Sequence, residues 1–309
     1  MLLYKLVLLL GILSLASCRR NRYRRYRFRK YFNRRSCGSY PSAITESELK
    51  ALGEQIWRED TNRVQHGIGF RLDMQTNAGY NGVDYASRPL FKFVNQSVLQ
   101  KPSVRAMVAL FDNYKRAIGS SEYVSSGERS ENWNFLNTVT STRPMELVYQ
   151  FLLRKKVVCS LKDFKNSLYN IWFNLYARRS SKKRYTSGLD SSGFEHVFVG
   201  ETDSSKVLGL HNWIQFYLQE KNRNIDYKGY KGYIKQSSVF TCQFSWYGLL
   251  KSIGGAFVGT SPEFDFAIYS LTFMSKVRNP IYTFGGDRVR VKCYGIAGGK
   301  IGTCYPILL

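Results

Sequence analysis

Histidine and acidic side chains are both scarce in this sequence. Only 3 of the 309 residues are histidine, and 22 acidic residues stand against 46 lysines and arginines, so the formal net charge is +24. The spacing of the 6 cysteines matches no zinc module, and the chain has no P-loop, dinucleotide-binding fingerprint, HExxH motif or internal repeat. These absences argue against the common nucleotide-binding and metalloprotease classes. The charge excess indicates a polyanionic partner, which would be nucleic acid, a heparin-like sugar or an anionic membrane.

The first 18 residues, MLLYKLVLLLGILSLASC, have the pattern of a secretory signal peptide. Lys5 provides the positive charge, an apolar run from Leu6 to Leu15 follows, and small residues come next. The run is too short to span a membrane, so we predict a secreted protein without a transmembrane span. The letters LASC also fit a bacterial lipoprotein signal, in which Cys18 would carry the lipid.

Disulfides are expected if the protein enters an oxidising compartment. Cys293 and Cys304 flank the Gly-rich stretch YGIAGGKIGT, which can fold as a hairpin, so they are the pair that we expect first. The sequence leaves the other pairings open. If the leader is removed together with Cys18, an odd number of cysteines remains and at least one is unpaired within the chain.

Residues 19–35, RRNRYRRYRFRKYFNRR, contain 10 lysines or arginines and no acidic residue. A run of like charge without an apolar period cannot bury itself, so we predict a disordered basic tail over residues 19–43. Its interleaved aromatic residues suit single-stranded RNA, but the same run would also bind heparan sulfate or an anionic membrane. Arg22–Arg25 resemble a furin-type processing site, so the tail is alternatively a propeptide that is removed.

The body of the protein, residues 44–309, begins with helical patterns. TESE at Thr45–Glu48 is a capping box, and apolar residues follow it at helical spacing. The same periodicity predicts three further helices, over residues 104–119, 145–154 and 161–177. We therefore predict a helical part over residues 44–178, which ends in a polar, basic stretch at residues 178–188 that indicates an exposed loop.

The sequence pattern of residues 190–309 is typical of β-strands. Aromatic and β-branched residues, partly alternating with polar ones, predict strands in VFTCQFSWYG, FDFAIYSLTFM and RVRVKCYG. A helical part followed by a sheet-rich part places the body in the α+β class.

Two of the three histidines lie close together and beside carboxylates. His196 stands in SGFEHVFVGE between Glu195 and Glu201, and His211 follows in GLHNWIQFY. Without metal-ligand spacing, such a pair suits acid–base chemistry, because imidazole titrates near neutral pH. The glutamates would orient the imidazoles or hold a divalent ion. The alternative for each histidine is a purely structural role, which is the commoner one for a lone histidine.

Cleavage of RNA by its own 2′-hydroxyl group requires such a pair. One group removes the 2′-hydroxyl proton, and another protonates the departing 5′-oxygen. A fixed cation must also stabilise the charge that builds on the phosphorus oxygens. Lys251 in SWYGLLKSIGG is the candidate for this cation.

Four segments of the body resemble the XendoU, or EndoU, family of poly(U)-specific endoribonucleases. They are SGFEHVFVGE, GLHNWIQFYLQEKNRNIDYKGY, FSWYGLLKSIGGAFVGTSPEFDFAIY and the ending GTCYP, and the resemblance extends over residues 45–309. It implies an α+β fold with a helical part and two antiparallel sheets that flank an active-site groove. We expect a monomer.

The resemblance implies a role for each residue of the constellation. It places the two catalytic histidines at His196 and His211, with His211 as the base and His196 as the acid, and the catalytic lysine at Lys251. Glu195 and Glu201 match glutamates that the family needs around the first histidine. The family typically uses Mn²⁺, for which these two glutamates are the possible ligands.

The resemblance also implies where the uridine binds. GTCYP matches a segment that supplies a threonine and a tyrosine near the uridine, here Thr303 and Tyr305, and Tyr305 would pack against the ribose or the base. Family members commonly have a serine four residues after the lysine, where it helps to read uracil, but this chain has Gly255. Thr260 or Ser261 would then compensate for the missing serine.

Together these matches imply a secreted endoribonuclease that cuts single-stranded RNA at uridines and leaves 2′,3′-cyclic phosphate and 5′-hydroxyl ends. The alternative is a secreted basic RNA- or heparin-binding protein on the same fold with weak or no cleavage, which Gly255 and the basic tail would favour. The third histidine, His66, lies outside the matching segments, so we expect it on the surface or in a structural role. Trp213 and Trp246 are expected in the core.

Overall fold

The computed structural model describes residue 37 and residues 40–178, 188–232 and 238–309. The predicted signal peptide, the basic tail up to residue 36 and most of the polar loop at residues 178–188 lie outside the described residues. Among the residues that are described, no helix combines the length and the apolar character that crossing a membrane requires.

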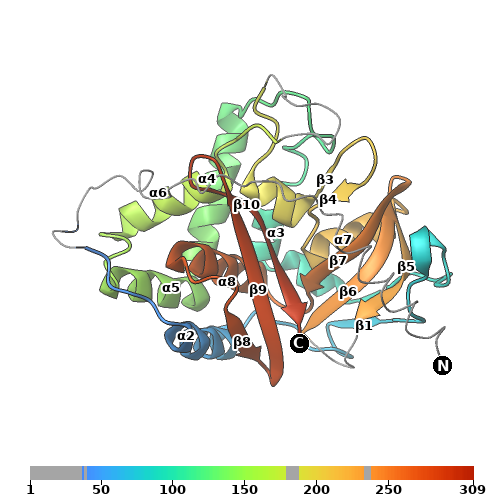
Figure 1. The fold of residues 1–309 in the computed structure, drawn as a ribbon, viewed down its shortest axis with the longest axis horizontal. Helices are drawn as coiled ribbons and strands as arrows, with labels where there is room; N and C mark the ends of the chain where they lie inside the picture. The colour runs from blue at the N-terminus through green and yellow to red at the C-terminus, as the bar shows by residue number, and fades with distance from the viewer. Residues whose placement is uncertain (1–36, 38–39, 179–187, 233–237) are drawn as a thin grey trace, which may run out of the picture. The chain divides into compact units, whose positions relative to one another are not determined.

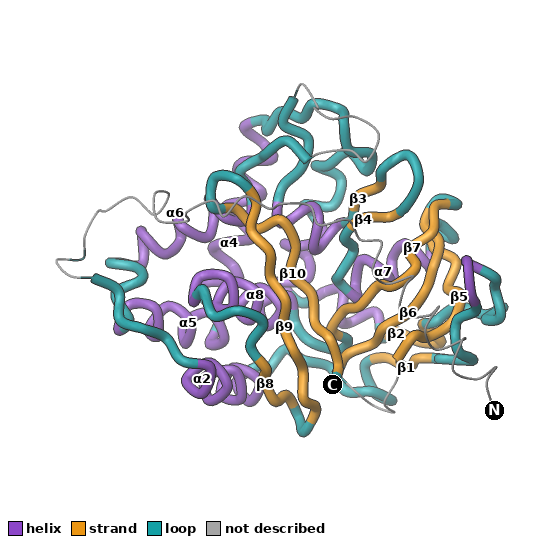
Figure 2. Tube along the Cα trace, in the orientation of Figure 1, coloured by secondary structure: helices purple, strands orange, loops and turns teal. Residues whose placement is uncertain are grey.

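Helices dominate the first half of the described chain, as its periodicity predicts (Figure 2). The helices are α2 (Glu46–Glu59), α3 (Pro102–Val108), α4 (Ser126–Thr140), α5 (Arg143–Arg154) and α6 (Leu161–Trp172). The predicted capping box starts α2: Glu48 N donates to Thr45 Oγ1 at 3.3 Å, and Thr45 N donates to Glu48 Oε2 at 3.0 Å. Between α2 and α3 lie two 3₁₀ turns and an antiparallel pair, namely η2 (Tyr80–Gly82), η3 (Gln96–Gln100), β1 (Phe70–Leu72) and β2 (Phe91–Val94).

The second half contains two three-stranded antiparallel sheets, in the orders β5–β6–β7 and β10–β9–β8. The strands are β5 (Ile225–Gly232), β6 (Val239–Trp246), β7 (Leu249–Phe257), β8 (Ile281–Phe284), β9 (Asp287–Ile296) and β10 (Lys300–Leu308). A short antiparallel pair precedes them, β3 (Glu201–Thr202) and β4 (Val207–Leu208). Figure 1 shows α2, α5 and α6 on one side of the β8–β10 sheet and the β5–β7 sheet on its other side. The α+β class and the two antiparallel sheets are therefore confirmed.

One predicted strand is wrong, because FDFAIYSLTFM lies in helix α8 (Pro262–Ser275). Ser261 caps this helix by accepting a hydrogen bond from Phe264 N at 3.1 Å, and Pro262 stands in its first turn. The helix is buried on nearly all sides, so apolar residues occupy every face and the helical period disappears from the sequence. What remains is an aromatic, β-branched run that imitates a strand.

Two helix boundaries differ from the prediction, and one helix was not predicted. The helix predicted over residues 104–119 ends at Val108, and the chain after it turns toward β3, where Ala117 forms a bridge with Thr202. The helix predicted over residues 161–177 ends at Trp172. Helix α4 is not evident from the apolar pattern, because its buried face includes Asn132 beside only a few apolar side chains.

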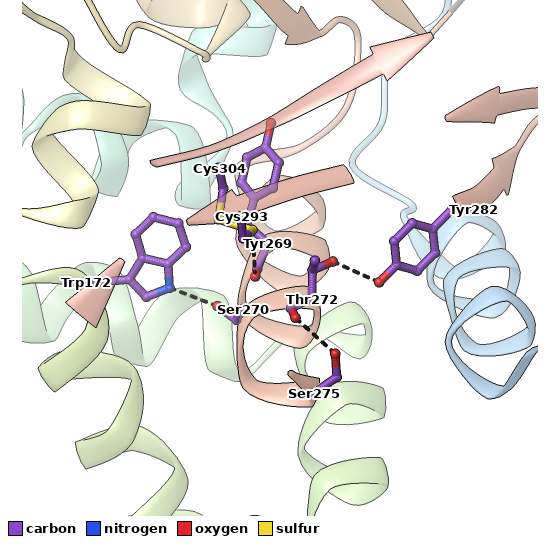
Figure 3. Close-up of a disulfide and its surroundings, with 8 residues drawn as sticks. All are labelled: Trp172, Tyr269, Ser270, Thr272, Ser275, Tyr282, Cys293 and Cys304. Atoms are coloured by element: carbon purple, nitrogen blue, oxygen red, sulfur yellow. Dashed lines mark hydrogen bonds between the residues drawn. A yellow bond between two sulfur atoms is a disulfide. The ribbon is translucent and has the colours of Figure 1, made fainter. Parts of the chain in front are cut away.

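The described residues contain two disulfides. Cys293–Cys304, which is confirmed, joins facing residues of β9 and β10. Figure 3 shows this bridge against Tyr269 of α8. The second disulfide, Cys37–Cys159, ties the segment before α2 to the residues just before α6. Each bridge therefore fixes a segment at the edge of the helical part or of the β8–β10 sheet.

Removing Cys37–Cys159 should destabilise the fold more than removing Cys293–Cys304. In the chain-entropy account, a disulfide contributes more to the free energy of unfolding when it closes a longer loop. The sequence separation is 122 residues for Cys37–Cys159 and 11 residues for Cys293–Cys304. We expect a loss of about 4–5 kcal/mol for the Cys37→Ser, Cys159→Ser variant and about 2–3 kcal/mol for the Cys293→Ser, Cys304→Ser variant. Urea unfolding of both variants measures the difference, and equal losses would contradict this expectation.

Candidate active site

The histidine pair lies where the two three-stranded sheets approach each other. The approach is close at Gly255 of β7, where a Cβ atom would stand 3.2 Å from Pro306 O of β10. The residues singled out from the sequence come from four elements: His196 from the π-helical turn η4 (Glu195–Val199), His211 from the residues before α7 (Trp213–Lys221), Lys251 from β7 and Tyr305 from β10. The fold thus assembles them from distant parts of the sequence.

Glu195 holds the turn that carries His196. Glu195 N donates to Ser192 Oγ at 3.1 Å, and Ser192 N donates to Glu195 Oε2 at 3.1 Å, which is the reciprocal pattern of a capping box. Glu195 is fully buried, and burial raises the pKa of its carboxyl group well above the ordinary value, with Glu201 adding like charge. Glu195 therefore acts on His196 through the backbone of a π-helical turn, a rare conformation that is frequent at functional sites.

Glu201 makes the direct contact with His196. His196 Nδ1 lies 2.6 Å from Glu201 Oε2, and Arg178 Nε lies 3.0 Å from the same oxygen. Arg178 also donates to Gly302 O at 2.7 Å, which ties it to β10. Burial raises the pKa of Glu201, and the Arg178 guanidinium opposes this shift. Because an ionised carboxylate only accepts, His196 donates from Nδ1 and its Nε2 points away from Glu201.

His211 is held in one tautomer by the backbone. Its Nδ1 lies 2.8 Å from Gly255 O, and a carbonyl oxygen only accepts, so Nδ1 carries the proton and Nε2 has the lone pair. The ring stacks on Tyr305 with the ring centroids 5.2 Å apart and an interplanar angle of 24°. His211 N donates to Val197 O at 2.7 Å, which joins this residue to the turn of His196. The imidazole is therefore oriented before any substrate binds.

The two imidazoles and Lys251 influence one another electrostatically. The ring centroids of His196 and His211 are 6.1 Å apart. Burial lowers the pKa of both histidines well below the ordinary value; Arg178 adds to the shift at His196, and Lys251 adds to both shifts. Burial also lowers the pKa of Lys251 to about 8, with Lys206 adding to the effect. At neutral pH the site therefore holds two neutral imidazoles beside a charged lysine.

Thr303 and Tyr305 flank Cys304 on β10 and face the same side of the strand. Tyr305 reaches His211, as described above, and its ring centroid lies 6.5 Å from that of Tyr294 across the hairpin. The Thr303 hydroxyl is buried and has no hydrogen-bond partner among the described residues. The Cys293–Cys304 bridge thus fixes the hairpin that carries both the Tyr305 ring beside His211 and the buried Thr303 hydroxyl group.

Thr260 and Ser261, the residues expected to compensate for the serine that is absent at Gly255, lie at the start of α8. Thr260 is 1 % exposed and its hydroxyl donates to Asp265 Oδ1 at 2.7 Å. Ser261 is 3 % exposed and its hydroxyl caps α8. Both hydroxyl groups are thus buried and hydrogen-bonded at the start of that helix, an arrangement that does not favour the expected role in reading uracil.

Glu195 and Glu201 do not fit a metal site. Both side chains are fully buried, one oxygen of Glu195 accepts from Ser192 N, and one oxygen of Glu201 is shared by His196 and Arg178. In the part of the chain that the structure describes, no group of three or more His, Cys, Asp or Glu side chains can hold a metal ion. Hard divalent cations need several oxygen ligands, which this pair does not provide.

Sequence reasoning missed two residues of the site. Arg178 opens the polar stretch and reads as part of a loop, yet its side chain is only 16 % exposed and reaches Glu201. Gly209 has a φ of +61°, and a Cβ atom there would stand 1.8 Å from His196 O. For Gly209, the one local signal is that a glycine stands two residues before His211. For Arg178, nothing in the local sequence indicates a role in the site. The other predicted positions agree with the structure: His66 is exposed, and Trp213 and Trp246 are buried.

Comparison with known proteins gives consistent matches. A family model described as Endoribonuclease XendoU matches residues 48–306 of the chain. The poly(U)-specific endoribonuclease of Xenopus tropicalis is 40% identical over 283 residues, which cover 85% of this chain and 94% of that protein. The uridylate-specific endoribonuclease B of Danio rerio is 41% identical over 278 residues, which cover 85% and 96%. The solved structure of XendoU, described as a splicing independent snoRNA processing endoribonuclease, is similar with a TM-score of 0.73 at 38% identity and covers 85% of this chain and 97% of that chain.

Proposed function

Because this chain belongs to the XendoU family of endoribonucleases, we propose that it cleaves single-stranded RNA at uridines. The 2′-oxygen of the uridine attacks the adjacent phosphorus, and the 5′-oxygen of the next nucleotide leaves. The products then carry 2′,3′-cyclic phosphate and 5′-hydroxyl ends. The observation that carries the proposal is a pair of imidazoles 6.1 Å apart, one paired with a carboxylate and the other with a carbonyl oxygen.

His211 is the base in this mechanism. Its Nδ1 proton is donated to Gly255 O, so the Nε2 lone pair is available to take the proton of the 2′-hydroxyl group. Burial and the neighbouring Lys251 keep the free ring neutral at physiological pH, which is the state that a base requires.

His196 is the acid, because the Glu201 carboxylate at 2.6 Å stabilises its imidazolium form. Protonated His196 then gives its Nε2 proton to the departing 5′-oxygen. In the free site, burial and the cations Arg178 and Lys251 lower the pKa of His196. A bound phosphodiester adds negative charge, which raises this pKa again, so we place the uptake of the proton in the RNA complex.

Lys251 supplies the positive charge for the phosphorus oxygens, and it should therefore set the alkaline limit of the reaction. Since the pKa of Lys251 in the free protein is about 8, kcat/KM should fall above that pH as the charge is lost, because kcat/KM reports the groups of the free enzyme. Lys251→Arg keeps a charge and should lose the alkaline limb, whereas Lys251→Met should lower kcat by a factor on the order of 10²–10³. The pH profile of kcat/KM measures the alkaline limb, and kcat at neutral pH measures the loss in Lys251→Met. If the rate of Lys251→Arg still falls near pH 8, the titration that causes this fall belongs to another group.

Thr303 and Tyr305 carry the preference for uridine in this proposal. The buried Thr303 hydroxyl lacks a hydrogen-bond partner among the described residues, and a uracil edge would supply one. Tyr305 packs against the ribose or the base beside His211. Gly255 contributes only its carbonyl oxygen, which His211 already uses. Selectivity for uridine that depends on these two residues alone should be lower than selectivity to which a serine also contributes.

We also propose that the protein is secreted. The leader at residues 1–18 supports this, and the two disulfides fit an oxidising compartment. Expression in a secretory cell should release the protein into the medium with a new N-terminus after residue 18, and retention inside the cell with the leader intact would contradict it.

The direct test is cleavage of a short single-stranded RNA that contains one uridine among adenosines. We expect the unsubstituted protein to cut after the uridine. The His196→Ala variant is the matched control and should cut far more slowly. Parallel reactions with Mn²⁺ and with EDTA test the metal dependence that the family resemblance implies. Equal cleavage after adenosine would remove the uridine preference but keep the chemistry. Tight, salt-sensitive binding without any cleavage would contradict the proposal and favour an RNA-binding protein.

A further inference from the structure

An aromatic and cationic surface lies at the tip of the β6–β7 hairpin, on the strand pair that carries Lys251. Tyr247 in the turn is 51 % exposed, and the guanidinium carbon of Arg116 lies 3.7 Å from its ring centroid. The same guanidinium lies 5.9 Å from the ring of Trp246. Neither Tyr247 nor Arg116 has a part in the reaction described above.

The turn does not explain why a tyrosine stands there. Tyr247 has a φ of +49° and Gly248 a φ of +78°, so both central residues of the two-residue turn are left-handed. Such turns favour asparagine at the first position, and a bulky residue in this conformation is unusual. A residue held against the local preference is a pointer to function, provided that the surroundings fix it.

The surroundings do fix it. Tyr247 N donates to Asn224 O at 2.9 Å. The preceding Trp246 is 3 % exposed, and its Nε1 donates to Gln219 Oε1 at 3.0 Å. The exposed ring is therefore a rigid platform on a buried anchor, and binding to it costs little conformational entropy.

Arg116 and Tyr247 are both tied to the active site. Thr202 N donates to Arg116 O at 2.7 Å, and Thr202 directly follows Glu201, which holds His196. Tyr247 precedes Lys251 by four residues, so the two are at most about 13 Å apart, the length that four residues span in a fully extended strand. An RNA chain that has a phosphate at Lys251 therefore has a neighbouring nucleotide within reach of this surface.

We propose that Arg116 and Tyr247 form an additional nucleotide subsite, in which a base outside the cleaved linkage stacks and its phosphate is neutralised. This inference rests on RNA being the substrate. Bases stack on tyrosine rings and on guanidinium planes, and such stacking tolerates every base. The subsite thus increases affinity for longer RNA without adding sequence preference. The exposed Lys206, in the turn between β3 and β4, extends the positive charge toward Lys251.

The test compares two substrates and two pairs of variants. Tyr247→Asn removes the ring and keeps a residue that tolerates the left-handed turn, and Arg116→Gln removes the charge. The matched controls are Tyr40→Asn, at another exposed tyrosine, and Arg154→Gln at the end of α5, which Figure 1 shows well away from β7. The substrates are the dinucleotide uridylyl-adenosine and a longer oligoadenylate with one uridine.

In Tyr247→Asn, the ratio of KM for the longer RNA to KM for the dinucleotide should rise about 5- to 100-fold, the worth of one stacked base. The Kd of the longer RNA should rise by a similar factor. In Arg116→Gln, the slope of log Kd against log salt should fall by about 0.7, the share of one phosphate contact, whereas Tyr247→Asn should leave that slope unchanged. Neither control should change these quantities.

Three results would overturn the inference. The first is an unchanged KM ratio in Tyr247→Asn. The second is an equal loss of kcat on both substrates in that variant, which would show that the turn supports the active site itself. The third is a salt slope in Arg116→Gln equal to that of the unsubstituted protein. Kd is measured with the longer RNA carrying 2′-deoxyuridine in place of uridine, which lacks the attacking 2′-oxygen, so this inference and the proposed function fail separately. If neither RNA is cleaved but the Kd effects are present, the subsite stands and the proposed reaction does not.

Discussion

Replacing His211 by alanine should lower kcat for RNA cleavage by a factor on the order of 10²–10⁴, the usual contribution of one general base, with a small change in KM. The ring is already oriented by Gly255 O at 2.8 Å and by the stack on Tyr305, so its loss removes a positioned lone pair rather than a binding contact. Single-turnover cleavage of an RNA with one uridine measures the effect.

His196→Ala should cause a loss of the same order, because acid and base work in one step. The double variant should be little slower than the slower single variant, since residues that act as a unit are not additive. His66→Ala is the matched control: this third histidine is exposed and forms an edge contact with Phe70 at 5.5 Å. A His211→Ala enzyme with the unsubstituted kcat would remove the base from the mechanism.

Gly209→Ala should damage both the fold and the reaction, although Gly209 lies outside the catalytic set. The left-handed backbone at φ +61° costs alanine about 1–2 kcal/mol. The added Cβ would also stand 1.8 Å from His196 O, so the turn that carries the acid must move. A displacement of about 1 Å at a catalytic group can reduce the rate on the order of 10²-fold. We therefore expect lower stability in urea together with a kcat lowered by about that factor.

Gly67→Ala separates the two causes. Gly67 has a φ of +87°, but nothing lies within 4 Å of the position that its Cβ would take. This variant should therefore lose about 1–2 kcal/mol of stability and keep its kcat. If Gly209→Ala loses stability but keeps its kcat, as expected for Gly67→Ala, then the close approach of Gly209 to His196 does not affect the reaction.

Local signals in the sequence were sufficient for several elements. The Thr45–Glu48 capping box marks the start of α2, and the Gly-rich stretch between Cys293 and Cys304 marks the β9–β10 hairpin. Both depend on interactions between residues that are near in sequence. Helix α8 shows the opposite case, because burial on nearly all sides removes the periodic contrast on which pattern recognition depends.

The sequence indicated that glutamates orient the imidazoles, but it did not show which glutamate binds the ring or which partners come from tertiary contacts. Glu195 and Glu201 both stand near His196 in sequence, yet one caps the backbone turn and the other binds the ring. Arg178 reaches the site because it bridges Glu201 and Gly302 O of β10, a residue more than a hundred positions away. From the sequence, Gly255 was interpreted only as the absence of a serine side chain. In the structure its carbonyl oxygen fixes the His211 tautomer.

The central claim is that the nucleophile is the 2′-oxygen of the RNA itself, activated by His211. The most direct measurement replaces the single uridine of the test RNA by 2′-deoxyuridine and determines the product ends of both RNAs by mass. We predict no cleavage at the deoxyuridine, and a 2′,3′-cyclic phosphate end after the ribose uridine. Cleavage at the deoxyuridine at a comparable rate would show that water attacks the phosphorus, and it would contradict the roles assigned to His196 and His211.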